Sequence, residues 1–213
     1  FQQVDPTNKL TMYIMPRKQT SLDKTDFRKK LCEAALRIFV EEGIDSTTMR
    51  RLAGELGVSA MTPYGYFEDR QHILDEVLAL AYSDFTASQQ EALDPWAKPM
   101  ENLKNLGEAY LRFALEHPLQ YSAMFLIQKQ ELFTTMEIQK DTFLPLLDTV
   151  TQLVDSGELE GGPVLIAHLL WSGLHGLISL KLAGRLRTDL SQPMEKMISE
   201  MNLRLVQSFF KTS

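Results

Sequence analysis

The sequence predicts an all-α protein, and two observations carry the prediction. Apolar residues recur at the helical spacing of about 3.6 residues in almost every segment after residue 24. No segment sustains the two-residue alternation of a half-buried strand. The chain has 213 residues, of which 44% are apolar and 23% charged, so it can bury a core. We therefore expect about nine helices and exclude disordered and collagen-like classes.

The first three expected helices form one group. The first covers residues 25–42 and places apolar residues along one face. The second is short and follows Thr47 or Thr48, either of which can accept a hydrogen bond from a free backbone N–H. Gly57 then begins a tight turn into a third helix over residues 59–66. Two short helices joined by such a turn constitute a helix-turn-helix unit.

Longer helices account for the rest of the chain. They are expected over residues 69–93, 99–116, 118–128, 131–155, 163–184 and 192–210. Prolines and glycines such as Pro95, Pro118 and Gly157 separate them, because these residues interrupt helical hydrogen bonding or geometry. Pro145 lies inside one of these segments and should kink or split the helix there.

The charge is unevenly distributed along the chain. The net charge is −6, which argues against a nucleic-acid binder that works through overall positive charge. Residues 1–75 contain 11 basic and 11 acidic residues, so the whole excess of acid lies in residues 76–213. The segment Arg17–Arg37 has seven basic residues against three acidic ones, a local charge of +4. A polyanion can dock there despite the global sign; alternatively, the segment is a solvated helix start.

The sequence offers little sign of secretion, membrane insertion or metal binding. A lone Cys32 excludes an internal disulfide and favours a reducing cytoplasm. Residues 1–15 lack the apolar segment of a signal peptide, and a start at Phe1 instead of Met indicates either processing or an engineered start. Residues 164–180 carry no charge, but their polar residues favour a buried or interface helix over a membrane span. His168 and His175 lie too far apart on a helix to chelate one ion, so we expect neither metal nor cofactor.

One motif connects the helix-turn-helix to a known family. The segment TTMRRLAGELGVSAMTPYGYFEDRQHIL, together with the preceding ALRIFVEEG, resembles the DNA-binding domain of the tetracycline-repressor (TetR) family. The resemblance covers residues 25–78 and includes the Tyr-x-Tyr-Phe sequence at the end of the third helix. It implies a homodimeric bacterial transcription regulator, most often a repressor, that is released from a palindromic double-stranded DNA operator by a small effector.

Groove geometry assigns roles to the residues of this motif. We expect the third helix to enter the major groove by its N-terminal end. Its first residues would meet base edges, and its tyrosines and the start of the second helix would hold phosphates. The expected DNA contacts are Thr47, Thr48, Arg50, Ser59, Ala60, Met61, Thr62, Tyr64, Tyr66 and Arg70. Phe67 is expected in the core, and Arg17 and Lys18 either follow the DNA backbone or belong to a disordered tail.

The motif departs from the family pattern at three positions. Pro63 replaces an aliphatic residue, and proline tolerates only the first turn of a helix, so the third helix must start by Met61 or be distorted. Gly65 replaces a basic residue or histidine, which removes one DNA contact, and Arg70 replaces a lysine. The family's operator sequence therefore does not carry over to this chain.

We expect three regions along the chain. Residues 1–22 form a flexible segment, 23–70 the DNA-binding domain and 71–213 a helical domain for effector binding and dimerisation. The dimer should form through the helices at about 163–184 and 192–210, where Gly173 and Gly176 allow close approach. The resemblance implies the same four-helix interface. In addition, Trp171-Ser-Gly-Leu-His175-Gly176 resembles the Trp-His-Gly signature of one C-terminal subgroup.

The effector is expected to be a small apolar or aromatic molecule. Aromatic and methionine side chains make adaptable pockets, although each of these residues can equally belong to the core. The candidate lining residues are Tyr110, Phe113, Tyr121, Met124, Phe125, Trp171 and His175. Two alternatives stay open. One is an interaction adaptor with weakened DNA binding, and the other is an enzyme, for which no phosphate loop or nucleophile motif is present.

Overall fold

The computed structural model describes residues 21–126, 135–186 and 194–210. These contain eight α-helices and two short 3₁₀-helices: α1 Ser21–Glu42, η1 Ile44–Ser46, α2 Met49–Glu55, η2 Pro63–Gly65, α3 Arg70–Ala92, α4 Pro99–Glu116, α5 Pro118–Phe125, α6 Thr135–Asp155, α7 Pro163–Leu182 and α8 Met194–Gln207. Within these ranges extended pairing is limited to one isolated bridge between Leu159 and Phe210. The all-α prediction is confirmed. Arg17, Lys18 and residues 1–20 of the expected flexible segment lie outside the described residues.

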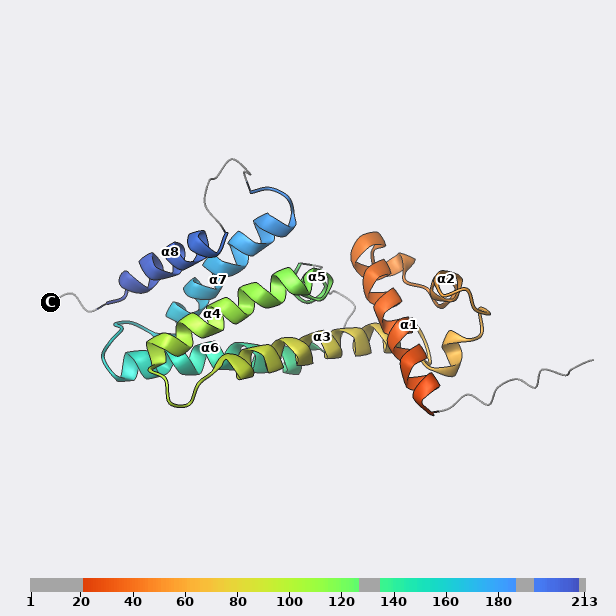
Figure 1. Cartoon of the computed structure of the whole chain (residues 1–213), viewed down its shortest axis with the longest axis horizontal. Helices are drawn as coiled ribbons and strands as arrows, with labels where there is room; N and C mark the ends of the chain where they lie inside the picture. The colour runs from red at the N-terminus through yellow and green to blue at the C-terminus, as the bar shows by residue number, and fades with distance from the viewer. Residues whose placement is uncertain (1–20, 127–134, 187–193, 211–213) are drawn as a thin grey trace, which may run out of the picture.

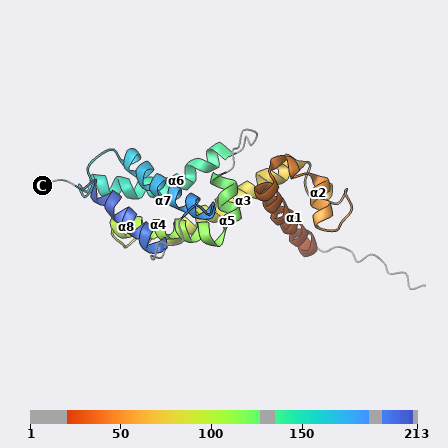
Figure 2. The same cartoon turned by 90° about the horizontal axis from the view of Figure 1, so that it is seen from above.

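The molecule is elongated, with a small head at one end and a helical body at the other (Figures 1 and 2). The head consists of α1, α2 and η2, and the body of α4 to α8. Helix α3 begins in the head and runs into the body, where it lies beside α4 and α6. The two parts are therefore joined by a helix and not by a flexible linker.

The head has its own apolar core. Leu31, Ala35 and Ile38 of α1 pack against Leu52 of α2 in this cluster. The other members are Cys32, Ala34, Met49, Phe67, Ile73 and Val77, so the start of α3 also belongs to the cluster. Phe67 is 1% exposed, which confirms the prediction that it lies in the core.

The turn of the helix-turn-helix follows the sequence prediction closely. Thr48, one of the two expected caps, accepts a hydrogen bond from the backbone N–H of Arg51 at 3.2 Å. Gly57 adopts a positive φ of 65°, a region that favours glycine. The backbone N–H of Val58 donates to Ala53 O at 2.9 Å and closes the corner after α2.

The third helix of the head differs from the expected α-helix over residues 59–66. The structure has a turn there, followed by the 3₁₀-helix η2, in which Gly65 N donates to Thr62 O and Tyr66 N to Pro63 O. Pro63 explains the difference, because it has no N–H to donate to Ser59 O, as residue i of an α-helix would to residue i−4. Thr62 N makes a tighter bond to Ser59 O at 2.9 Å instead. The departure from the family pattern therefore has a structural consequence.

The body contains two apolar clusters. The larger one joins α3, α4, α5, α7 and, through Ile198, α8, and it also includes Phe39 of α1. The smaller one joins α6, α7 and α8 through residues such as Leu153, Ile166 and Val206. Pro145 does not split α6, which the structure describes as one helix through Asp155. The Thr149 hydroxyl donates to Pro145 O at 2.8 Å within this helix.

The two glycines of α7 have different surroundings. A Cβ atom at Gly173 would lie 2.9 Å from Leu205 Cδ1 and 3.4 Å from Met201, both on α8 of the same chain. A Cβ at Gly176 would meet nothing within 4 Å. The expectation that both glycines serve a contact between subunits is therefore corrected for Gly173, which allows α8 to pack closely on α7.

This difference predicts opposite outcomes for two matched substitutions. Gly176→Ala should stabilise the folded chain by about 0.5–1 kcal/mol, since alanine favours the helix and its Cβ would meet no atom of the same chain within 4 Å. Gly173→Ala should lose this gain, because the tip of Leu205 must shift, and should end about 1–2 kcal/mol less stable than Gly176→Ala. Chemical denaturation of both variants measures the difference. Equal stabilities would contradict the assigned packing.

Candidate nucleic-acid interface and ligand cavity

The turn and η2 present an exposed surface at the end of the head. The side chain of Met61 is 71% exposed and that of Tyr64 is 51% exposed. Ser59 and Ala60 are also exposed, and Thr62 is half-buried. The structure thus brings five of the expected DNA-facing residues together on one surface.

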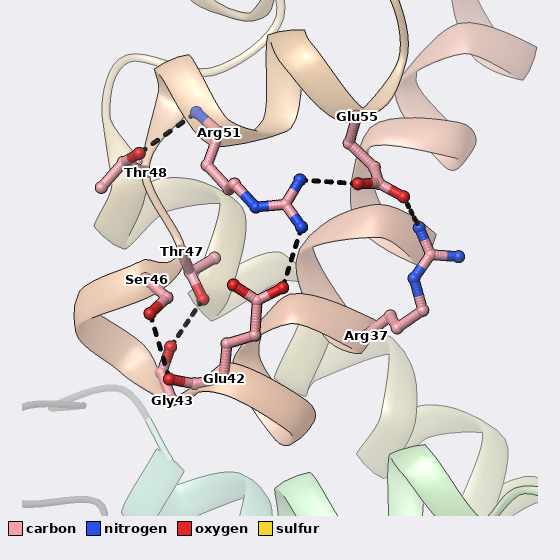
Figure 3. A network of polar contacts seen from close by, with 8 residues as sticks. All are labelled: Arg37, Glu42, Gly43, Ser46, Thr47, Thr48, Arg51 and Glu55. Carbon is pink, nitrogen blue, oxygen red and sulfur yellow. Dashed lines mark hydrogen bonds and ion pairs between the residues drawn. The ribbon is translucent and has the colours of Figure 1, made fainter.

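A network of ion pairs fixes α2 on α1 (Figure 3). Arg51 donates to Glu42 at 2.8 Å and to Glu55 at 2.6 Å, and Arg37 also donates to Glu55. The hydrogen bond from Arg51 holds the pKa of the Glu55 carboxyl below its usual value. The charges of the two arginines and the two glutamates balance. Neither arginine therefore provides a free cation for phosphates.

Arg50 differs from its neighbour Arg51. It is exposed on α2, and it makes no ion pair with any residue in the described part of the chain. Thr48 is also exposed, with its hydroxyl engaged as the helix cap. Of the two adjacent arginines, Arg50 is the one whose charge is available to a polyanion.

Three of the expected DNA contacts are placed differently. Thr47 is fully buried, and its hydroxyl donates to Gly43 O at 3.1 Å, so its side chain stabilises the loop and does not face the surface. Arg70 donates to Ile44 O at 3.3 Å and lies 3.8 Å from the Asp45 carboxylate. This bond ties the start of α3 to η1. The assignment of Thr47 is corrected on these grounds, whereas that of Arg70, which is half-buried, stays a prediction.

Tyr66 is the third of these residues. It is half-buried, and its ring packs on Phe27 with centroids 5.1 Å apart. Its carbonyl accepts a hydrogen bond from Arg28, which also pairs with Glu76 and stacks 4.2 Å over the Phe67 ring. Tyr66 therefore belongs mainly to the head's structure.

Ion pairs also reduce the positive charge that the segment Arg17–Arg37 can offer to a polyanion. Arg28 is neutralised by Glu76, and Arg37 by Glu55, both from outside the segment. Lys24, Lys29 and Lys30 remain exposed on α1. Lys29 lies 4.0 Å from Glu33, at the limit of an ion pair. The positive charge of the described head is therefore carried by lysines of α1 and by Arg50.

A cavity of about 1490 Å³ occupies the body. It is lined from α3, α4, α5, α6, α7 and α8. Four of the expected ligand-binding residues line it: Tyr110, Met124, Phe125 and Trp171. The other three, Phe113, Tyr121 and His175, do not line it, and their assignment is corrected. They lie in the aromatic cluster next to the lining, since Tyr110 packs on Tyr121 and Phe125 on His175.

A closed set of hydrogen bonds lies beside the cavity. Trp171 Nε1 donates to Tyr110 Oη at 3.1 Å, and the hydroxyls of Tyr110 and Tyr121 are 3.2 Å apart. Tyr121 Oη lies 2.6 Å from His175 Nδ1. A neutral imidazole that carries its proton on Nε2 accepts this bond at Nδ1. Every hydroxyl in the set thus has a partner, and the set fixes α4, α5 and α7 against one another.

Burial keeps these groups uncharged. It raises the pKa of Tyr121 to about 12 and raises the pKa of Tyr110 as well. It also lowers the pKa of His175 from the ordinary value of 6.5. Elsewhere, burial raises the pKa of the Cys32 thiol to about 12, so this thiol is not a nucleophile at neutral pH.

The sequence reasoning missed several lining residues. Tyr82, Phe85 and Gln89 of α3 line the cavity, as does Phe143 of α6. Phe85 and Gln89 are one helical turn apart, on the face of α3 that packs inward. A glutamine among aromatic residues on a buried stripe was the available signal. The residues that the structure describes contain no cluster of three potential metal ligands.

The lowered pKa of His175 predicts a pH dependence of stability. A histidine whose pKa is lower in the folded chain binds fewer protons when folded, so its contribution is lost as pH falls below 6.5. The free energy of unfolding should therefore decrease from pH 7.5 to pH 5.5, and less so in His175→Gln. Urea denaturation at both pH values measures this. His168→Gln, on the exposed side of the same helix, is the control, and an unchanged decrease in His175→Gln would contradict the assignment.

Two family models match separate parts of the chain. The model described as "Bacterial regulatory proteins, tetR family" matches residues 31–77. The model described as "Tetracyclin repressor-like, C-terminal domain" matches residues 103–201. Together they cover the head and most of the body.

Individual relatives agree with these matches. The repressor KstR2 of Mycobacterium tuberculosis is 31% identical over 90 residues, which are 42% of this chain and 44% of that protein. The uncharacterized regulator YhgD of Bacillus subtilis is 27% identical over 115 residues, 54% of this chain and 59% of that one. The chain thus spans about half the length of the curated relatives it matches.

A solved structure shows the same fold. The crystal structure of the TetR family regulator PfmR of Thermus thermophilus superimposes with a TM-score of 0.67 at 22% identity. The superposition covers 83% of this chain and 97% of that one. The helix-turn-helix head, the helical body and the two matched family models together show that this chain belongs to the TetR family of bacterial regulatory proteins.

Proposed function

We propose that the chain is a homodimeric, DNA-binding transcriptional regulator, and that it represses genes until a small effector binds the body. The observation that carries the proposal is the exposed surface of the turn and η2, held rigidly by the head's core. Met61 and Tyr64 stand out from this surface, and Arg50 adds an unpaired charge beside it. Repression, as opposed to activation, is supported by KstR2, a relative named as a repressor.

The exposed residues divide into two roles on DNA. Ala60, Met61 and Thr62 come first on the turn and would meet base edges, where an apolar side chain contacts the thymine methyl group. Tyr64 and Arg50 would contact phosphates and fix the register of the head. Within η2 only Tyr64 projects an exposed side chain, since Pro63 is buried and Gly65 has none, so the base contacts fall to the turn before η2. Operator specificity is then carried chiefly by residues 60–62.

Dimerisation is supported by the exposed apolar surface of α7. Val164 is 54% exposed and Leu165 61%, and Leu169 and Leu180 are also exposed. Helix α7 is long and apolar enough to cross a membrane, and only 28% of its apolar window is buried within the chain. A second copy of the chain would cover this surface and place two heads at a two-fold spacing. A two-fold protein reads a palindromic operator.

Effector binding is supported by the cavity. Its lining is mainly apolar and aromatic, as in pockets for small apolar ligands. We also propose that the body belongs to the Trp-His-Gly subgroup. Trp171 lines the cavity, and His175 makes the closed set of hydrogen bonds beside it, so the signature residues lie where an effector would act.

An interaction adaptor without DNA binding is the second candidate, because Pro63 replaces the usual recognition helix with η2. Operator selection from random DNA by the purified protein separates the two. The regulator should select a palindrome, and Tyr64→Ala should weaken binding to it about tenfold, since a charge-assisted phosphate contact is lost. Failure of the parent protein to retard any DNA at low salt would favour the adaptor.

The two adjacent arginines predict different salt dependences. Arg50→Ala should weaken operator binding and reduce the slope of log K against log salt by about 0.9, as expected when one phosphate contact is lost. Arg51→Ala removes the same charge but should leave the slope unchanged, because Glu42 and Glu55 already neutralise Arg51. Fluorescence anisotropy at several salt concentrations measures both slopes. Equal reductions would show that net charge, and not the unpaired Arg50, governs binding.

A further inference from the structure

Among the residues that the structure describes, one buried side-chain polar group, Gln89 Nε2, lacks a hydrogen-bond partner. The buried polar residues of the described chain are Thr47, Gln89 and Thr149. Both threonine hydroxyls donate to carbonyls of their own segments. Gln89 is 5% exposed, and its Nε2 has no partner among the residues that the structure describes. An unpaired buried amide donor is costly, so natural proteins seldom keep one without a purpose.

The place of Gln89 indicates that purpose. Gln89 lines the cavity together with Phe85, one helical turn before it on α3, and Tyr82 lies a further turn toward the head. The rise of a helix puts Gln89 about 10 Å from Tyr82 along α3. The aromatic residues Phe85, Tyr110 and Phe125 therefore occupy one part of the lining, and the amide lies farther from the head.

The other polar groups of the lining have partners or lie in water. Tyr82 Oη donates to Met124 O at 3.1 Å, and Tyr110 and Trp171 bond to each other. Lys104 and Arg112 are the cations of the lining, and both are exposed on α4. No buried cation among the described lining residues could compensate a carboxylate. Transfer of a carboxylate from water to a buried site without a cation costs far more free energy than one hydrogen bond from Gln89 would recover.

We propose that the effector has an apolar body and a neutral carbonyl, as in a ketone or ester, and that Gln89 Nε2 donates a hydrogen bond to this carbonyl. The aromatic part of the cavity takes the apolar body. A neutral carbonyl needs a single donor and no counter-charge, and Gln89 offers such a donor in the buried part of the described lining, whereas Lys104 and Arg112 are exposed. The inference deepens the proposed effector function and rests on it.

A ligand-by-variant cycle tests the inference by direct binding. The probes are 4-phenyl-2-butanone, butylbenzene, which lacks the carbonyl, and 3-phenylpropanoate, which is charged. Binding is read from the fluorescence of Trp171, which lines the cavity, in the full chain carrying Trp96→Phe, since Trp96 is 94% exposed. Gln89→Leu removes the donor. Gln90→Leu, the same change at the next and exposed position, is the matched control.

The ketone should bind about tenfold more weakly to Gln89→Leu, while butylbenzene should bind no more weakly, and Gln90→Leu should change neither. Without ligand, Gln89→Leu should raise the melting temperature by roughly 2–4 °C, because the unpaired donor is gone. A structural role for the amide would lower it instead.

Besides a lowered melting temperature of Gln89→Leu, three results would overturn the inference. They are an equal effect of Gln89→Leu on ketone and hydrocarbon, tighter binding of the carboxylate than of the ketone, and no binding of any probe. Retardation of the selected operator by the same preparation reports on DNA binding independently. A failed carbonyl assignment is thereby distinguished from a failed regulator.

Discussion

Helix α3 determines how the two parts of this molecule can influence each other. Ile73 and Val77 on one side of the helix pack in the head, while Leu74 and Leu78 on the next side pack in the body. One rigid rod therefore contributes to two cores within its first turns. Any shift of α3 that repacks the body must also move residues of the head, because interiors are too closely packed to absorb it.

Helix α1 strengthens this connection. Phe39 belongs to the body's cluster, and Leu36 packs against both clusters. Helix α5 lies against α1 at the junction and supplies Met124 and Phe125 to the cavity (Figure 1). A ligand that displaces Phe125 therefore acts on an element in contact with the head. Residues of the cavity and of the exposed surface formed by the turn and η2 thus belong to one continuous packed structure.

The sequence predicted the regular parts of the molecule better than its sites, for physical reasons. Helical spacing, Gly57 and Thr48 determine local geometry, and the structure shows them as expected. The sequence predicted a distortion at Pro63, because proline lacks the backbone N–H. That the distortion would be the 3₁₀-helix η2 depended on which backbone hydrogen bonds formed around Pro63, and the sequence did not predict these bonds. The positions of the Arg70 and Tyr66 side chains depend on partners far away in the sequence. Arg70 bonds to Ile44 O and Tyr66 packs on the ring of Phe27, and no local sequence pattern reveals these contacts.

The ligand cavity shows the same limit. The sequence does not distinguish an aromatic residue that lines a cavity from one that packs behind the lining. Tyr110 lines the cavity and Tyr121 does not, and residue type alone could not predict this difference. Gln89 required the opposite reasoning. Its polarity was visible in the sequence, but its unpaired donor became apparent only once all neighbouring helices were in place.

The shared cores are tested most directly by calorimetry of the whole chain and of Leu78→Ala. Leu78 is fully buried in the body, and its truncation should cost about 2–5 kcal/mol. If α3 joins head and body as described, both proteins unfold in a single endotherm, and the substitution moves the whole endotherm to lower temperature. Two endotherms, of which only one moves, would contradict the account.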